Sequence, residues 1–147
     1  MINKFRNNLK KQKPQIGFWS QTLNFHQVEM ICQMNYSWIC FDMEHGIYSF
    51  KDISILSSLV KSYNKIPFVR VQKSKNEYVQ LSLDAGILGI ILPMIENGDH
   101  LLSLIKKSLN IFDQVIVAVS DGNTKNYLFD ANEREHLIKR ALFSDLK

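Results

Sequence analysis

Three ionisable residues directly follow a short apolar run in the first third of the chain. The run is Trp38 to Phe41, and Asp42, Glu44 and His45 come immediately after it. A buried parallel strand delivers the residues that follow it to the carboxyl edge of its sheet, where α/β folds keep their ligands. A histidine can move a proton near neutral pH, and a neighbouring carboxylate can fix its tautomer or hold the water shell of a metal. This cluster is therefore the first candidate for a functional site.

Two other expected strands bring an aromatic residue and a cation to the same edge. Trp19 ends an apolar run that starts at Ile16, and Arg70 lies in another run that follows Pro67. Arginine presents a planar fork that binds a carboxylate through two hydrogen bonds. Alone, Trp19 would be explained as a core residue and Arg70 as the partner of a carboxylate. Three strand ends that converge on one edge favour instead a site for a small anionic substrate.

Strand-like and helix-like segments alternate along the chain. The expected strands are continuous apolar runs, which is typical of a parallel sheet covered by helices. Helices are expected where apolar residues recur at helical spacing, and Asn24 with Gln27 has the sequence of a capping box. The expected strands are 16–19, 38–41, 68–71, 88–92 and 115–119, and the expected helices are 24–32, 50–63, 76–85, 98–109 and 132–143.

Five βα units in 147 residues place the chain in the α/β class. Two architectures remain open at this point, because periodicity alone does not separate them. One is a small doubly wound sheet, and the other is the first half of a (β/α)8 barrel. No linker or repeat interrupts the pattern, so we expect a single domain over 1–147. It would consist of a basic N-terminal helix at 1–13, βα units over 14–110 and a less regular segment over 111–147.

The composition is that of an ordinary globular protein. Apolar residues make up 46% and charged residues 22% of the chain, and no apolar run approaches the ~18 residues needed to cross a bilayer. No apolar leader precedes the first expected strand, so we expect a cytoplasmic protein without a membrane partner. Cys32 and Cys40 lack the spacing of a metal site and are expected to be buried free thiols.

The net charge of +4 comes from the N-terminal segment. Five basic residues precede the first acid, Glu29, and the remaining 13 basic residues nearly balance the 14 acidic ones. A basic arm can bind nucleic acid, but no aromatic or glycine motif of an RNA-binding protein follows. Phe5 and Leu9 lie four residues apart, which favours a helix packed on the body, with nucleic acid as the weaker alternative. The five basic residues are Lys4, Arg6, Lys10, Lys11 and Lys13.

Five short motifs occur in the order 15–19, 41–45, 67–71, 83–86 and 89–94. This ordered set, over roughly residues 3–105, resembles the HpcH/HpaI aldolase family, which also includes citrate lyase beta-like proteins. The resemblance implies a (β/α)8 barrel of the pyruvate/phosphoenolpyruvate type. It also implies a metal-dependent class II aldolase, a carbon–carbon lyase that joins or cleaves a pyruvate enolate and an aldehyde.

The resemblance also implies a role for each residue at the expected edge. His45 would be the acid/base residue that moves the proton in the aldol step. Arg70 would hold the carboxylate of the 2-keto acid and stabilise the enolate, and Trp19 would line the pocket. Asp42 and Glu44 would lie behind His45 or near the waters of a divalent metal, Mg²⁺, Mn²⁺ or Co²⁺. The partners would be a small 2-keto acid and an aldehyde.

The chain departs from the family pattern at the metal. The family's metal ligands are a glutamate after the fifth strand and an aspartate after the sixth, and neither has a match here; Asp121 is a poor substitute. The chain reaches about half of a barrel of roughly 250 residues, and a half barrel leaves two open sheet edges. We therefore expect a homo-oligomer or a complementing chain. The alternative is a catalytically inactive remnant or assembly partner.

Overall fold

The computed structural model describes the backbone of residues 2–22, 24–95, 98–110, 115, 117 and 130–145. The chain divides into two compact units, Met1–Met94 and Ile95–Lys147. The first unit contains a four-stranded sheet, and the described part of the second contains two helices.

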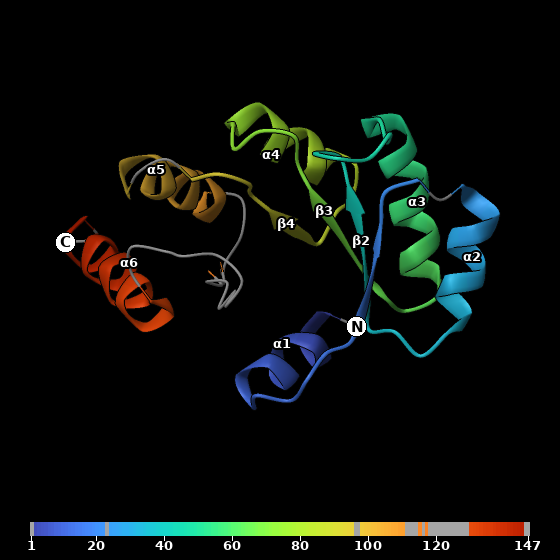
Figure 1. The fold of residues 1–147 in the computed structure, drawn as a ribbon, viewed down its shortest axis with the longest axis horizontal. Coiled ribbons are helices and arrows are strands. Elements are labelled where there is room, and N and C mark those ends of the chain that lie inside the picture. Colours follow the sequence, from blue (N-terminus) through green and yellow to red (C-terminus); the bar gives the residue numbers. More distant parts are fainter. Residues whose placement is uncertain are drawn as a thin grey trace. The chain divides into compact units, whose positions relative to one another are not determined.

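The first unit is a parallel sheet whose strands follow one another in chain order. A helix connects each strand to the next, so each crossover is a βα unit (Figure 1). A doubly wound sheet would reverse its strand order at a switch point, and the described sheet does not. Unbroken order is the arrangement of a barrel wall, which decides between the two architectures left open by the sequence. The elements are α1 (Ile2–Lys10), β1 (Gly17–Ser20), α2 (Phe25–Gln33), β2 (Trp38–Asp42), α3 (Phe50–Ser62), β3 (Ile66–Arg70), α4 (Asn76–Asp84) and β4 (Gly89–Ile91).

The main core lies between the sheet and the helices that connect its strands. Alternate residues of β2, Ile39 and Phe41, face this core and are fully buried, as is Val69 of β3. Val28 of α2 and Ile53 of α3 pack against them from the other side. Side chains of a strand alternate between the two faces, so the residues between these core positions point to the opposite face.

The opposite face is packed by aromatic rings at its amino end. Phe5 of α1 lies 5.9 Å from the ring of Phe68, and Trp38 lies 5.6 Å from the same ring. Two glycines make room for these rings. A Cβ on Gly17 would lie 1.9 Å from Trp38 Cδ2, and one on Gly89 would lie 2.2 Å from Phe68 Cε1. The buried Phe5 shows that the basic N-terminal helix packs on the body at this residue, whereas Leu9, the other residue of the expected apolar edge, is 42% exposed.

Strand and helix bounds differ from expectation by a few residues. β3 starts at Ile66 and includes Pro67, which the sequence placed before the strand. The carbonyl of Pro67 accepts a hydrogen bond from the Leu88 amide, just before β4 begins. The capping box of Asn24 and Gln27 is confirmed, and Gly86 has the positive φ of 79° expected after a helix.

The second unit contributes α5 (Gly98–Leu109) and α6 (Ala131–Asp145), close to the two helices expected there. The fifth strand expected at 115–119 lies mostly outside the described residues. Val115 and Val117 are described and belong to no strand or helix. No helix in the described ranges is long and apolar enough to cross a membrane.

Candidate active site

Asp42 is the centre of the polar cluster at the carboxyl edge of the sheet. It is the last residue of β2 and is fully buried, on the sheet face opposite the helices that connect the strands. Its Oδ1 accepts hydrogen bonds from Arg70 Nε at 2.9 Å, from the Glu44 amide at 3.0 Å and from the His45 amide at 3.2 Å. The carboxylate therefore fixes both the neighbouring strand end and the turn that follows its own strand.

The second oxygen of Asp42 reaches the two other strand exits. Its Oδ2 accepts from Arg70 Nη2, from Trp19 Nε1 at 3.2 Å and from Gln21 Nε2 at 3.3 Å. Burial alone would raise the pKa of this carboxyl. Hydrogen bonds from Arg70, the His45 amide, Trp19 and Gln21 more than reverse that effect and hold the pKa well below its usual range. Asp42 is therefore ionised at neutral pH, and both of its oxygens accept hydrogen bonds.

Arg70 lies between two carboxylates and an indole ring. Its Nε and Nη2 bond Asp42, and its Nη1 lies 2.9 Å from Glu44 Oε2. The guanidinium carbon lies 5.2 Å from the centre of the Trp19 ring, within the range of a cation–π contact. The hydrogen bond to Asp42 raises the pKa of Arg70. The two bonds to Asp42 fix the orientation of this cation, and Glu44 occupies the third nitrogen of its guanidinium group.

His45 lies on the exposed side of the same turn. Its side chain is 63% exposed, and its Nε2 lies 3.9 Å from Glu44 Oε2. Gly46 makes the tight turn possible, because a Cβ there would lie 2.0 Å from the Asp42 carbonyl oxygen and 2.6 Å from that of Gln21. The backbone of His45 is therefore fixed, whereas its imidazole is free to meet a molecule from solvent.

The structure brings all five predicted site residues to one edge. It also shows what the sequence did not predict: both carboxylates contact Arg70, and Gln21 belongs to the cluster. Gln21 comes directly after β1, so its place at a strand exit was a signal that could have identified it. The five predicted residues are Trp19, Asp42, Glu44, His45 and Arg70.

The described residues do not fit a divalent metal. Among them, no group of three or more histidine, cysteine, aspartate or glutamate side chains could hold one. Both oxygens of Asp42 are already occupied by donors, and one oxygen of Glu44 binds Arg70. Cys40 is buried beside the cluster, and burial raises the pKa of its thiol to about 12, so it is a neutral core residue.

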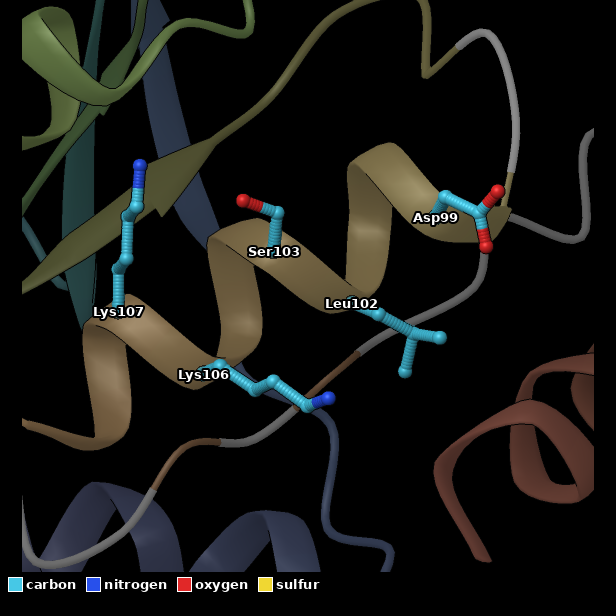
Figure 2. A pocket seen from close by; sticks show the side chains of 5 residues that line it. All are labelled: Asp99, Leu102, Ser103, Lys106 and Lys107. Atoms are coloured by element: carbon cyan, nitrogen blue, oxygen red, sulfur yellow. The ribbon is translucent and has the colours of Figure 1, made fainter. Parts of the chain in front are cut away.

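A hollow occurs on α5, and none of the residues that line it belongs to the polar cluster. It is lined by Asp99, Leu102, Ser103, Lys106 and Lys107. Figure 2 shows that Ser103 and Lys107 project to one side of the helix and Leu102 and Lys106 to another. The side chains do not converge on a common point, so the hollow offers no set of groups that could bind one ligand.

A parallel sheet of consecutive βα units with its polar residues at the carboxyl ends defines one wall of a (β/α)8 barrel enzyme. The family model described as HpcH/HpaI aldolase/citrate lyase matches residues 15–120, and the chain belongs to this family.

Comparisons with individual proteins agree and also show how much of each is covered. A 4-hydroxy-2-oxo-heptane-1,7-dioate aldolase from Salmonella dublin is 32% identical over 102 residues, which are 68% of this chain and 38% of that enzyme. A solved HpcH/HpaI aldolase/citrate lyase family protein from Burkholderia cenocepacia J2315 superposes with a TM-score of 0.65 at 22% identity, over 95% of this chain and 55% of that one. The chain thus spans about 38% of the aldolase relative.

A different relative matches a shorter stretch. A phosphopantetheine adenylyltransferase from Pelagibacter ubique (strain HTCC1062) is 59% identical over 46 residues, which are 31% of this chain and 28% of that enzyme. The identity is nearly twice that of the aldolase match, over less than half the length.

Proposed function

We propose that the chain forms the substrate-binding wall of a carbon–carbon lyase that cleaves or forms hydroxylated 2-keto acids. The observation that carries this proposal is the position of Arg70. Asp42 and Glu44 hold its guanidinium over the Trp19 ring at the strand edge, and His45 lies on the adjoining turn. A fixed cation, an aromatic wall and an exposed imidazole are what an enolate-forming reaction requires.

In the cleavage direction, His45 would take the proton from the hydroxyl group of a 4-hydroxy-2-keto acid. The bond between C3 and C4 then breaks and an aldehyde leaves. The electron pair of that bond stays with C3 and forms the enolate of pyruvate. Arg70 would bind the substrate carboxylate and stabilise the enolate oxygen. His45 would return the proton to C3, which releases pyruvate and restores the free imidazole. The condensation follows the same steps in reverse.

Glu44 sets a condition on substrate binding. Its carboxylate binds Arg70 Nη1, the one guanidinium nitrogen that Asp42 does not bind. A substrate carboxylate would therefore share or replace the Glu44 contact, while the two bonds to the buried Asp42 keep the guanidinium in place. Glu44 is 17% exposed and follows the strand end, so its side chain can move with less cost than Asp42 can.

The divalent metal implied by the family has no ligands among the described residues, so none of these steps is assigned to it. We propose that residues from a second copy or a companion chain complete the site. The alternative is a non-catalytic assembly partner, and the observation that favours it is that Asp42 and Glu44 are both committed to Arg70.

The test is cleavage of 4-hydroxy-2-oxo-heptane-1,7-dioate by the full chain, followed as pyruvate released, with Mg²⁺, Mn²⁺ or Co²⁺ added in turn. We expect turnover that is lost in His45→Asn and Arg70→Ala, with the fold of each variant checked by circular dichroism. A folded chain that releases no pyruvate under any of these conditions would favour the assembly partner. Turnover that survives both substitutions would contradict the assignment of the site.

A further inference from the structure

The chain is similar to two different classes of protein, an aldolase and an adenylyltransferase. All the motifs that resemble the aldolase family lie between Gln15 and Met94, which are the residues of the sheet and its helices. The aldolase match covers 68% of the chain and the adenylyltransferase match 31%, so the two would account for nearly all of it if they lie end to end. The unit Ile95–Lys147 is long enough to hold the 46-residue match.

We infer that the chain is a composite: a wall of an aldolase barrel joined to a segment shared with phosphopantetheine adenylyltransferases, which does not continue the barrel. The family model reaches residue 120, so the aldolase likeness extends into the second unit, and we place the change from one family to the other within 95–120. Only 28% of the adenylyltransferase is covered, so the inference concerns the origin and folding of this segment and not its activity.

This inference accounts for the departures from the aldolase pattern. The resemblance to the aldolase family implies a glycine-arginine-glycine motif after the helix that follows the fourth strand and a metal-binding glutamate after the fifth strand. Neither has a match in the sequence after α5, where 109–113 reads Leu-Asn-Ile-Phe-Asp. A diverged barrel would lose such residues singly, whereas a change of family removes them together. The metal ligands would then be missing because the residues that carry them in an aldolase are not the residues that follow Met94 here.

The superposition on the Burkholderia protein does not decide the question. It covers 95% of the chain at 22% identity, which is a likeness of fold alone. After Met94 the described residues form just two helices, α5 and α6. Amphipathic helices of similar length occur in barrels and in other α/β proteins, so their superposition carries no information about family.

The first test is nuclear magnetic resonance of the full chain of 17.1 kDa. A continued barrel requires a fifth strand paired in parallel with β4, which would give cross-strand contacts between the amides of 115–119 and those of Gly89–Ile91. The composite predicts that these contacts are absent while those between β3 and β4 are present. Observed pairing of 115–119 with β4 would overturn the inference.

The second test is hydrogen exchange of the full chain carrying Ile105→Asp, with Ser103→Asp as the matched control. Ile105 is buried and Ser103 exposed on the same helix. We expect Ile105→Asp to speed exchange in 98–110 by about tenfold or more and to leave β1 to β4 within about twofold of the parent, because separate units open separately. Loss of protection in β4 together with α5 would overturn the inference. Neither test involves His45 or Arg70, so its result is independent of the lyase proposal.

Discussion

The two tryptophans of the chain lie toward opposite ends of one sheet face and have different surroundings. Trp38 begins β2, packs against Phe68 over Gly17 and donates its indole N–H to the carbonyl of Gln15 at 2.9 Å. Trp19, near the end of β1, is 42% exposed and donates its N–H to Asp42 beneath Arg70. The amino end of this face is held by the shapes of rings, and the carboxyl end by charges.

We expect this difference to separate stability from function along the same strands. Barrel enzymes place chemistry at the carboxyl ends and use the amino ends for packing. Here the charged end is also strongly organised, because one buried carboxylate receives six hydrogen bonds from three strand exits. Substitutions at the two ends should therefore differ both in their cost and in the property that they change.

The largest effect is expected for Asp42→Ala. The substitution leaves the partly buried guanidinium of Arg70 without its main partner. It also leaves two backbone amides and an indole N–H without the acceptor that Asp42 provides. We expect the free energy of unfolding to fall by about 3 kcal/mol or more, as measured by urea denaturation. Asp84→Ala, which removes an exposed carboxylate, should cost about 0.5 kcal/mol or less. Equal costs at the two positions would contradict the central role of Asp42.

At the aromatic end, Gly17→Ala should cost about 1–3 kcal/mol, because its Cβ would overlap the Trp38 ring and force it to move. Gly98→Ala is the matched control, since nothing lies within 4 Å of a Cβ built there. Thermal denaturation of both variants gives the comparison. The Gly17 variant should retain the ligand-binding properties of the charged end, and a loss of binding would show that the two ends are coupled.

Acid should weaken the charged end selectively. The pKa of Asp42 is lowered in the folded chain from about 3.9 in an unfolded one, so its contribution to stability is complete above that value. The contribution is lost as the pH falls below about 4 toward the folded pKa. Asp42→Asn should therefore show a smaller loss of unfolding free energy between about pH 5 and pH 3 than the parent chain does. Parallel pH profiles would mean that another group dominates acid unfolding.

The smallest effect on stability is expected for His45→Asn, at about 0.5 kcal/mol or less, because the imidazole is mostly exposed. The hydrogen bond that the backbone amide of residue 45 donates to Asp42 is unchanged by the substitution. The same substitution should remove pyruvate release if the chain is catalytic. Equilibrium unfolding and the cleavage assay, performed on one preparation, separate the two properties. A large loss of stability would show that the side chain has a structural contact after all.

The sequence predicted that the site residues gather at the carboxyl edge of the sheet, but not the hydrogen bonds between residues of neighbouring strands there. Continuous apolar runs followed by ionisable residues located β2 and its exit, and alternation of strands and helices gave the α/β class. The pairing of Asp42 with Arg70 depends on strand register, which places the two residues directly opposite each other. Register follows from packing across the sheet and is not visible in the local pattern of either strand.

Other parts of the fold left no local signal. The close approaches of Gly17 to Trp38 and of Gly89 to Phe68 join residues about twenty apart, and a lone glycine does not show which ring will cover it. The capping box of Ser49 and Asp52 at the start of α3 was visible in principle, since the two stand at the required spacing.

The most direct measurement is a titration of the full chain with pyruvate, followed by the two indole N–H signals that its two tryptophans provide. An anion bound by Arg70 must disturb the ring that lies against the guanidinium. We predict that the Trp19 signal shifts with saturation, that the Trp38 signal stays in place as an internal control, and that Arg70→Lys weakens binding about tenfold by removing the planar fork. A Trp19 signal that does not move at saturating pyruvate, or that moves equally in Arg70→Ala, would contradict the account.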